Sequence, residues 1–170
     1  EDWNRVLNHI ANLFYEDSVI QFSQDGADMS ISFKHHTDSD YTITTHATLE
    51  VDGQTYTSDY SIGYATEGTE KEQSIRMKRA LSHVMLDVLE QYSGMTQQWG
   101  ILTGVRPTKL YHKLRKEGKT PEEIFEILKT DFRLSDAKIN LLKEIVARQL
   151  LVIPDLDELG KEISIYIGVP

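Results

Sequence analysis

The chain contains no cysteine among its 170 residues, and this absence excludes several kinds of chemistry. Disulfide bonds, thiolate nucleophiles, cysteine-ligated zinc and iron–sulfur ligation all require cysteine sulfur. No apolar run approaches the roughly 20 residues of a membrane-spanning helix, and the first residues lack the basic and apolar segments of a secretory signal. We therefore expect a cytoplasmic domain with no membrane span and no metal site of its own.

Basic residues are scarce in the first part of the chain. Residues 1–70 hold 13 acidic and two basic side chains, whereas residues 71–170 hold 14 acidic and 16 basic ones. Nucleic-acid binding depends on cationic side chains that neutralise phosphates. A small RNA-binding module remains an alternative for a helix, antiparallel strands and a second helix, but the acidic front half argues against it, so we expect no nucleic-acid partner.

The periodicity of the first half predicts a domain of mixed helix and antiparallel sheet. Apolar residues at spacings of three and four indicate an amphipathic helix that ends near Glu16. They are Trp3, Val6, Leu7, Ile10, Leu13 and Phe14. Residues 41–51 then alternate as a strand, with Tyr41, Ile43, Ala47, Leu49 and Val51 on the apolar side.

Two Asp-Gly pairs predict tight hairpin turns, because both central residues of a type I′ turn need positive φ. The turn at Asp25-Gly26 would pair Phe22 with Met29 and Ile20 with Ile31. The turn at Asp52-Gly53 would pair Leu49 with Tyr56, Thr45 with Tyr60 and Ile43 with Ile62. Both registers place apolar residues on a common face, so we expect a four-stranded antiparallel meander with one wet face.

A long helix follows the meander. Thr69 and Glu72 have capping-box spacing, and Gly94 suits the end of the helix. The apolar stripe consists of Leu81, Val84, Met85, Val88, Leu89 and Tyr92. We expect the first and the long helix to cover the apolar face of the sheet in a domain over residues 1–95.

The remainder predicts a helical unit over residues 96–162. Pro107 suits the first turn of a helix that ends near Gly118, Thr120 and Glu123 form a second capping box, and Ser135 caps a third helix. The third helix carries Ile139, Leu142, Ile145, Val146 and Leu150 as its stripe. Residues 163–170 then read as a single strand with no evident partner, which suggests a truncated protein.

Two segments resemble a known family. Residues 165–170 (Ile-Tyr-Ile-Gly-Val-Pro) resemble the first barrel strand of radical-SAM enzymes of the oxygen-independent coproporphyrinogen III oxidase family, where Phe-Cys-x-x-x-Cys-x-x-Cys follows directly. Residues 99–109 (Trp-Gly-Ile-Leu-Thr-Gly-Val-Arg-Pro-Thr-Lys) resemble the stretch before the barrel in its HemZ-type branch. Residues 12–16 and 154–156 are also similar to that branch.

The resemblance implies that this chain is the amino-terminal accessory region of a longer porphyrin-biosynthesis enzyme, and is not catalytic alone. The parent would bind a 4Fe-4S cluster and S-adenosylmethionine in a TIM-like barrel, and would convert coproporphyrinogen III to protoporphyrinogen IX. Its partners would be its own carboxy-terminal barrel and the porphyrinogen substrate. The alternatives are a haem chaperone, or a free-standing porphyrin-carrying or protein-interaction domain.

Residues 104–119 carry six basic side chains against Glu117 alone. Because Arg106 at the N-cap supplies no acceptor oxygen, the amides of the first turn could hold an anion. The segment could otherwise be a solvated face capped by Thr103, or a docking surface for the barrel. The candidate residues are Arg106, Thr108, Lys109 and Lys113.

Histidine offers a weaker candidate site. His35, His36 and Asp38 could be imagined as metal ligands, but adjacent histidines point in different directions and no third ligand is near in sequence. We therefore expect no metal there. For Tyr41, Tyr56 and Tyr60 we prefer a role in packing across strands to a role in stacking on a porphyrin.

Overall fold

The structure is a computed structural model that describes residues 2–16, 28–102 and 106–153. These residues contain five helices and three strands, which confirms the predicted α+β class. The chain divides into two compact units, Glu1–Gly104 and Val105–Pro170.

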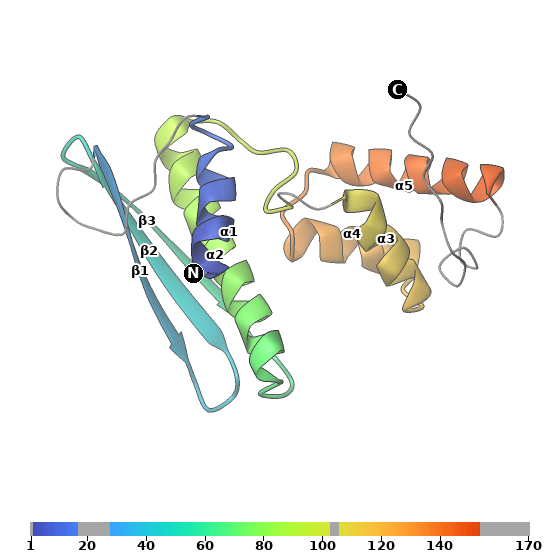
Figure 1. Cartoon of the computed structure of the whole chain (residues 1–170), viewed down its shortest axis with the longest axis horizontal. Helices are drawn as coiled ribbons and strands as arrows, with labels where there is room; N and C mark the ends of the chain where they lie inside the picture. The colour runs from blue at the N-terminus through green and yellow to red at the C-terminus, as the bar shows by residue number, and fades with distance from the viewer. Residues whose placement is uncertain (1, 17–27, 103–105, 154–170) are drawn as a thin grey trace, which may run out of the picture. The chain divides into compact units, whose positions relative to one another are not determined.

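The first unit packs two helices on one face of an antiparallel sheet, as Figure 1 shows. Its elements are α1 (Asp2–Ala11), β1 (Met29–Thr37), β2 (Ile43–Val51), β3 (Gln54–Ile62) and α2 (Glu70–Ser93). The described strands have the order β1-β2-β3. The fourth predicted strand, the turn at Asp25-Gly26 and the pairing of Phe22 with Met29 lie outside the described residues.

The hairpin between β2 and β3 has the predicted turn and register. Asp52 and Gly53 have φ values of 50° and 74°, as a type I′ turn requires. Leu49 pairs with Tyr56 and Ile43 with Ile62. The short-range Asp-Gly signal therefore set the pairing of two nine-residue strands correctly.

The other turn of the sheet differs from expectation. The strand predicted over residues 41–51 begins only at Ile43, because Asp38 organises a turn before it: its carboxylate accepts hydrogen bonds from the backbone N–H groups of Asp40 and Thr42, both at 2.9 Å. Tyr41 has a φ of 56° and is 38% exposed, so its place on the apolar strand face was wrong. The predicted end of the first helix near Glu16 was also late, since α1 ends at Ala11 and tighter i to i−3 bonds follow it.

The core of the first unit lies between the helices and the sheet. Side chains from α1, β2 and α2 form it, and Tyr56 and Tyr60 of β3 pack against it. Its buried members include Leu7, Ile10, Ala47, Leu49, Val84, Leu86, Val88 and Leu89. The prediction that both helices cover the apolar sheet face is thus confirmed, and the two tyrosines serve packing.

The second helix of this unit begins and ends where its sequence signals lie. Thr69 and Glu72 form a complete capping box, with the Thr69 backbone N–H 2.7 Å from the Glu72 carboxylate. Gly94 ends α2 with a φ of 69°, which suits a residue without a Cβ. The long helix therefore follows from local chemistry at both ends.

The division between the units falls after Gly104, whereas the sequence suggested residue 95. The segment after α2 belongs to the first unit because it is anchored there. The Gln97 backbone N–H donates to a Glu90 carboxylate oxygen at 2.8 Å, and the Gln97 side-chain amide donates to the Leu13 carbonyl at 3.1 Å. Ile101 packs against the core.

The second unit contains three helices with the predicted caps. They are α3 (Pro107–Lys116), α4 (Pro121–Thr130) and α5 (Asp136–Val152). Thr120 and Glu123 form the second capping box, and Ser135 accepts from the Lys138 backbone N–H. The buried core consists of Tyr111, Leu114, Ile124, Leu128, Leu134, Ile139, Leu142 and Val146. The strand predicted over residues 163–170 lies outside the described residues.

Candidate functional site

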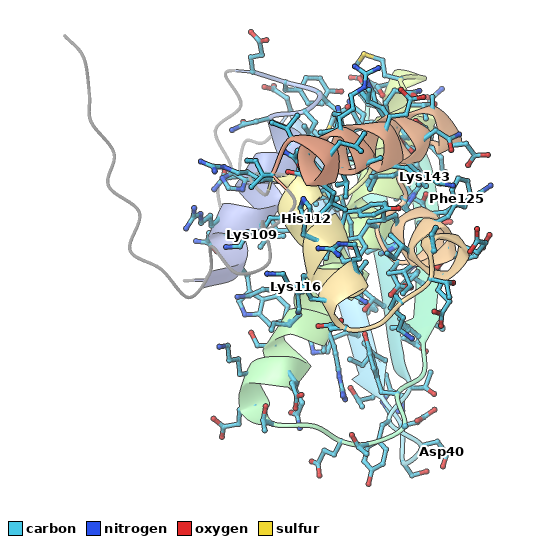
Figure 2. All side chains as sticks on the ribbon, turned by 90° about the vertical axis from the view of Figure 1, so that its right-hand side faces the viewer. Asp40, Lys109, His112, Lys116, Phe125 and Lys143 are labelled. Carbon is cyan, nitrogen blue, oxygen red and sulfur yellow. The ribbon has the colours of Figure 1, made fainter. Side chains whose placement is uncertain are left out.

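The helix α3 presents a row of exposed lysines, which we call the α3 basic face: Lys109, Lys113 and Lys116. Their spacing of four and three places them on one side of the helix, while Tyr111 and Leu114 are buried on the other. Figure 2 shows Lys109 and Lys116 on α3, with Phe125 and Lys143 to the other side of that helix. The three side chains of the α3 basic face are therefore exposed on one side of the helix.

The first turn of α3 is less open to an anion than the sequence suggested. Arg106 is the N-cap and makes no capping hydrogen bond with its side chain, as predicted. However, the Lys109 backbone N–H donates to the Arg106 carbonyl at 3.0 Å, so one of the three amides proposed for an anion is occupied. Thr108 is half-buried, and the alternative cap Thr103 lies outside the described residues.

Lys113 of the α3 basic face has an acidic neighbour. Lys113 Nζ lies 3.7 Å from Glu117 on the next turn, with both side chains at least half exposed. Such pairs contribute only a few tenths of a kcal/mol, about 0.3–0.5 for helical i,i+4 pairs. A stronger acidic partner could therefore displace Glu117 at little cost.

The inner side of α3 is joined to α5. The His112 imidazole Nε2 lies 2.9 Å from the Gln149 side-chain oxygen, and His112 Nδ1 is buried without a hydrogen-bond partner among the described residues. Burial raises the pKa of the neighbouring Tyr111 hydroxyl, and the Glu122 carboxylate raises it further. The Tyr111 hydroxyl therefore stays protonated at neutral pH and packs as a neutral side chain.

A shallow concavity lies in each unit among the described residues. In the second unit, Tyr111, Phe125 and Ile139 line about 270 Å³ with Glu122 and Lys143 close by. Ligand pockets usually measure about 300–1,000 Å³, so this space falls just below that range. It has acidic and basic groups but no constellation of nucleophile, base and oxyanion donors.

The concavity of the first unit lies between two segments that carry the family resemblance. A volume of about 330 Å³ is lined by His9 of α1 and Leu13 just after it, and by Trp99 and Leu102 from the segment after α2. The bond from Gln97 to the Leu13 carbonyl holds the two segments together. Residues 12–16 and the start of residues 99–109 thus meet in space, although they are far apart in sequence.

The outer face of the sheet carries a hydrogen-bonded row that the sequence analysis did not single out. His46 Nδ1 lies 2.7 Å from an Asp59 carboxylate oxygen, and His46 Nε2 lies 3.1 Å from the Thr48 hydroxyl. The order of groups is that of an acyl-transfer triad, but Asp59 is 70% exposed and the face is open. The register around Asp52-Gly53 could have indicated the pairing of residues 46 and 59.

The described residues offer no site for a metal ion, since they hold no group of three or more suitable ligands. His35 and His36 lie within β1, not at a turn, and the His35 ring stacks on Trp3 at a centroid distance of 6.5 Å. Asp38 serves the turn described above. No helix in the described part of the chain has the length and hydrophobicity to cross a membrane.

Comparison with known proteins relates this chain to a curated bacterial protein. No protein-family model matches the chain, and no solved structure matches it. Over 169 residues, or 98% of its length, the chain is 41% identical to the oxygen-independent coproporphyrinogen-III oxidase-like protein HemZ of Bacillus subtilis (strain 168), of which the match spans 33%. The resemblance predicted from residues 99–109 and 165–170 is thus confirmed: this chain is similar, along nearly its whole length, to one third of HemZ.

Proposed function

We propose that this chain is the amino-terminal accessory region of a longer HemZ-like oxidase of porphyrin biosynthesis. The identity of 41% over 98% of the chain carries the proposal, together with the match to only a third of the relative. The described residues support it, because neither concavity presents a catalytic constellation. The region contributes structure and contacts, and the rest of the parent contributes the reaction.

The parent acts, in this proposal, on coproporphyrinogen III in the cytoplasm, and converts two propionate side chains to vinyl groups by oxidative decarboxylation. A radical-SAM enzyme supplies this chemistry with a 4Fe-4S cluster and S-adenosylmethionine. The residues of this chain do not fit that cluster, because the chain has no cysteine and its described part has no metal-ligand group. The cluster ligands therefore belong, in this proposal, to the remainder of the parent.

The α3 basic face serves, in this proposal, as a docking surface for the parent's own barrel rather than as a ligand site. Lys109 and Lys113 are exposed, and Arg106 at the N-cap is exposed beside them. The Lys109 amide is already bonded and Thr108 is half-buried, which disfavours an anion cradle at this helix end. Long cationic side chains can instead pair with carboxylates on a facing surface.

The first test is to read the coding frame beyond Pro170 and to assay its full product. We expect the motif Phe-Cys-x-x-x-Cys-x-x-Cys directly after Pro170, and anaerobic decarboxylation of coproporphyrinogen III by the purified full-length protein. The 170-residue chain alone should show no turnover. A frame that lacks the cysteine motif would reject the radical-SAM assignment, and a loaded enzyme that retains haem without decarboxylation would indicate a haem chaperone instead.

A further inference from the structure

The helix α5 carries two apolar stripes. The inner stripe consists of Ile139, Leu142 and Val146, which are 1–2% exposed and form the core with α3 and α4. The second, which we call the α5 outer stripe, consists of Leu141, Ile145 and Val152 at spacings of four and seven residues. A helix with one covered face needs only one apolar stripe. The second stripe therefore calls for a different explanation.

The α5 outer stripe is not covered within the described residues. Leu141 is 42% exposed and Val152 is 79% exposed, while Ile145 between them is half-buried. Leu151, beside the end of the stripe, is 80% exposed. Single exposed apolar side chains are ordinary, but a row at helical spacing with an apolar neighbour marks a contact surface.

Cationic groups border this stripe. Arg148 is exposed and lies on the same side of α5 as the stripe, one turn before Val152. The bond between His112 and Gln149 places α3 directly beside this part of α5. His112 is three residues after Lys109 and four before Lys116, so it is a neighbour of both along α3, where Figure 2 labels all three. The α5 outer stripe and the α3 basic face thus form one surface with an apolar centre and a basic border.

We infer that this surface docks onto the remaining part of the parent polypeptide, through a facing surface that is apolar at its centre and acidic at its border. The inference rests on the proposed function, since the relative has about two thirds of its length beyond the match. The charge favours this occupant: the chain has a net charge of −9, yet this surface is basic. A second copy would bring two basic borders together, which is repulsive.

Single cysteines report the docking without reference to activity. The chain has no native cysteine, so Val152→Cys introduces one thiol into the stripe. Ala147→Cys is the matched control, because Ala147 is exposed on α5 away from the stripe. Each variant is made in the 170-residue chain and in the full-length protein, and the rate of thiol alkylation is followed at that peptide by mass spectrometry. Circular dichroism checks that the helices are retained.

Docking predicts that alkylation at position 152 slows by roughly tenfold or more in the full-length protein, because the centre of an interface excludes water. The rate at position 147 should be the same in both proteins. Equal rates at positions 152 and 147 in the full-length protein would overturn the inference. Slow alkylation at position 152 in the 170-residue chain would also overturn the inference. If that rate falls as the protein concentration rises, a second copy of the chain covers position 152. If the rate does not depend on protein concentration, another part of the same chain covers it.

The alkylation test and the enzyme assay can reject the docking surface and the proposed reaction independently of each other. A full-length protein that protects position 152 but does not decarboxylate coproporphyrinogen III would keep the docking surface and reject the proposed reaction. An active full-length enzyme in which position 152 reacts as fast as position 147 would keep the reaction and reject the docking surface.

Discussion

Thr45 lies in the middle of β2 with its side chain fully buried and facing the core. Its hydroxyl has no hydrogen-bond partner among the described residues, which is costly for a buried polar group. Thr44, its neighbour on the outer face, instead pairs with the Ser61 hydroxyl at 3.0 Å. Two adjacent threonines thus have opposite energetic roles because successive side chains of a strand face opposite sides.

Replacing Thr45 by valine should stabilise the protein. Valine has nearly the same shape and removes a hydroxyl whose burial costs on the order of 1 kcal/mol. We expect Thr45→Val to raise the free energy of unfolding by about that amount in urea titrations followed by circular dichroism. Thr44→Val is the matched control and should be neutral or destabilising, because it removes the bond to Ser61. A destabilised Thr45→Val would mean that the hydroxyl is satisfied.

At the scale of single elements, the start of α2 shows how a few residues define a helix. The backbone N–H of Thr69 and then its hydroxyl donate to the Glu72 carboxylate, and these bonds lower the pKa of Glu72 from its ordinary value of 4.5. A carboxyl with a lowered pKa in the folded state stabilises the protein above its unfolded pKa. That stabilisation is lost as the pH falls through the folded pKa.

Replacing Glu72 by glutamine should therefore weaken the pH dependence of stability below about pH 4.5. We expect a smaller drop in the thermal unfolding midpoint between pH 7 and pH 3 than in the parent chain, and a lower midpoint at pH 7. Glu70→Gln is the control, since Glu70 lies in the same helical turn but does not bond to Thr69. The same pH profile for both variants would contradict a specific role for the capping box.

At the scale of the whole molecule, the exposed charged and apolar side chains are distributed unevenly along the chain. The front of the chain is acidic, and the basic residues are concentrated in the second unit on α3. The α5 outer stripe adds apolar surface to the same unit. Neither feature belongs to the buried core of the second unit, so we expect both to have their main effect in the longer protein.

Two aspartates in the α5 outer stripe should distinguish the chain from its parent. In the 170-residue chain, Leu141→Asp with Val152→Asp replaces exposed side chains and should change the free energy of unfolding by no more than about 1 kcal/mol. In the full-length protein the same change should lower the thermal unfolding midpoint, because it places two charges in the proposed interface. Asn140→Asp with Ala147→Asp supplies the control on the polar side of α5. A midpoint equal to that of the control would argue against docking.

The basic border of the docking surface should act through charge. Replacing Arg106 and Lys109 by alanine in the full-length protein removes two exposed cations and should weaken docking by about 1 kcal/mol at low salt. The readout is faster alkylation of Val152→Cys, with a difference from the parent that shrinks as salt is added. Lys71→Ala with Lys143→Ala is the control, because it also removes two cations but not from the basic border. Unchanged alkylation together with unchanged turnover would reject a role for Arg106 and Lys109 in docking or in substrate binding.

The sequence by itself determined the features that depend on neighbours along the chain. The turn at Asp52-Gly53 requires two adjacent residues that tolerate positive φ, and the caps at Thr69, Thr120 and Ser135 require groups within three residues. The similarity to HemZ could also be recognised from the sequence alone, because residues 99–109 form a continuous block. Such signals are short in range, so folding does not alter them.

Only the tertiary structure decided which surfaces meet and which stay open. Periodicity placed Ile145 in the same stripe as Leu142, but it could not show that Leu142 is buried and Ile145 only half-buried, since both are apolar residues at helical spacing. The anchoring of Gln97 to Leu13, which moved the unit boundary to Gly104, joins residues far apart in the chain. Burial and long-range contact depend on how elements pack in space, and a linear pattern contains that information only in part.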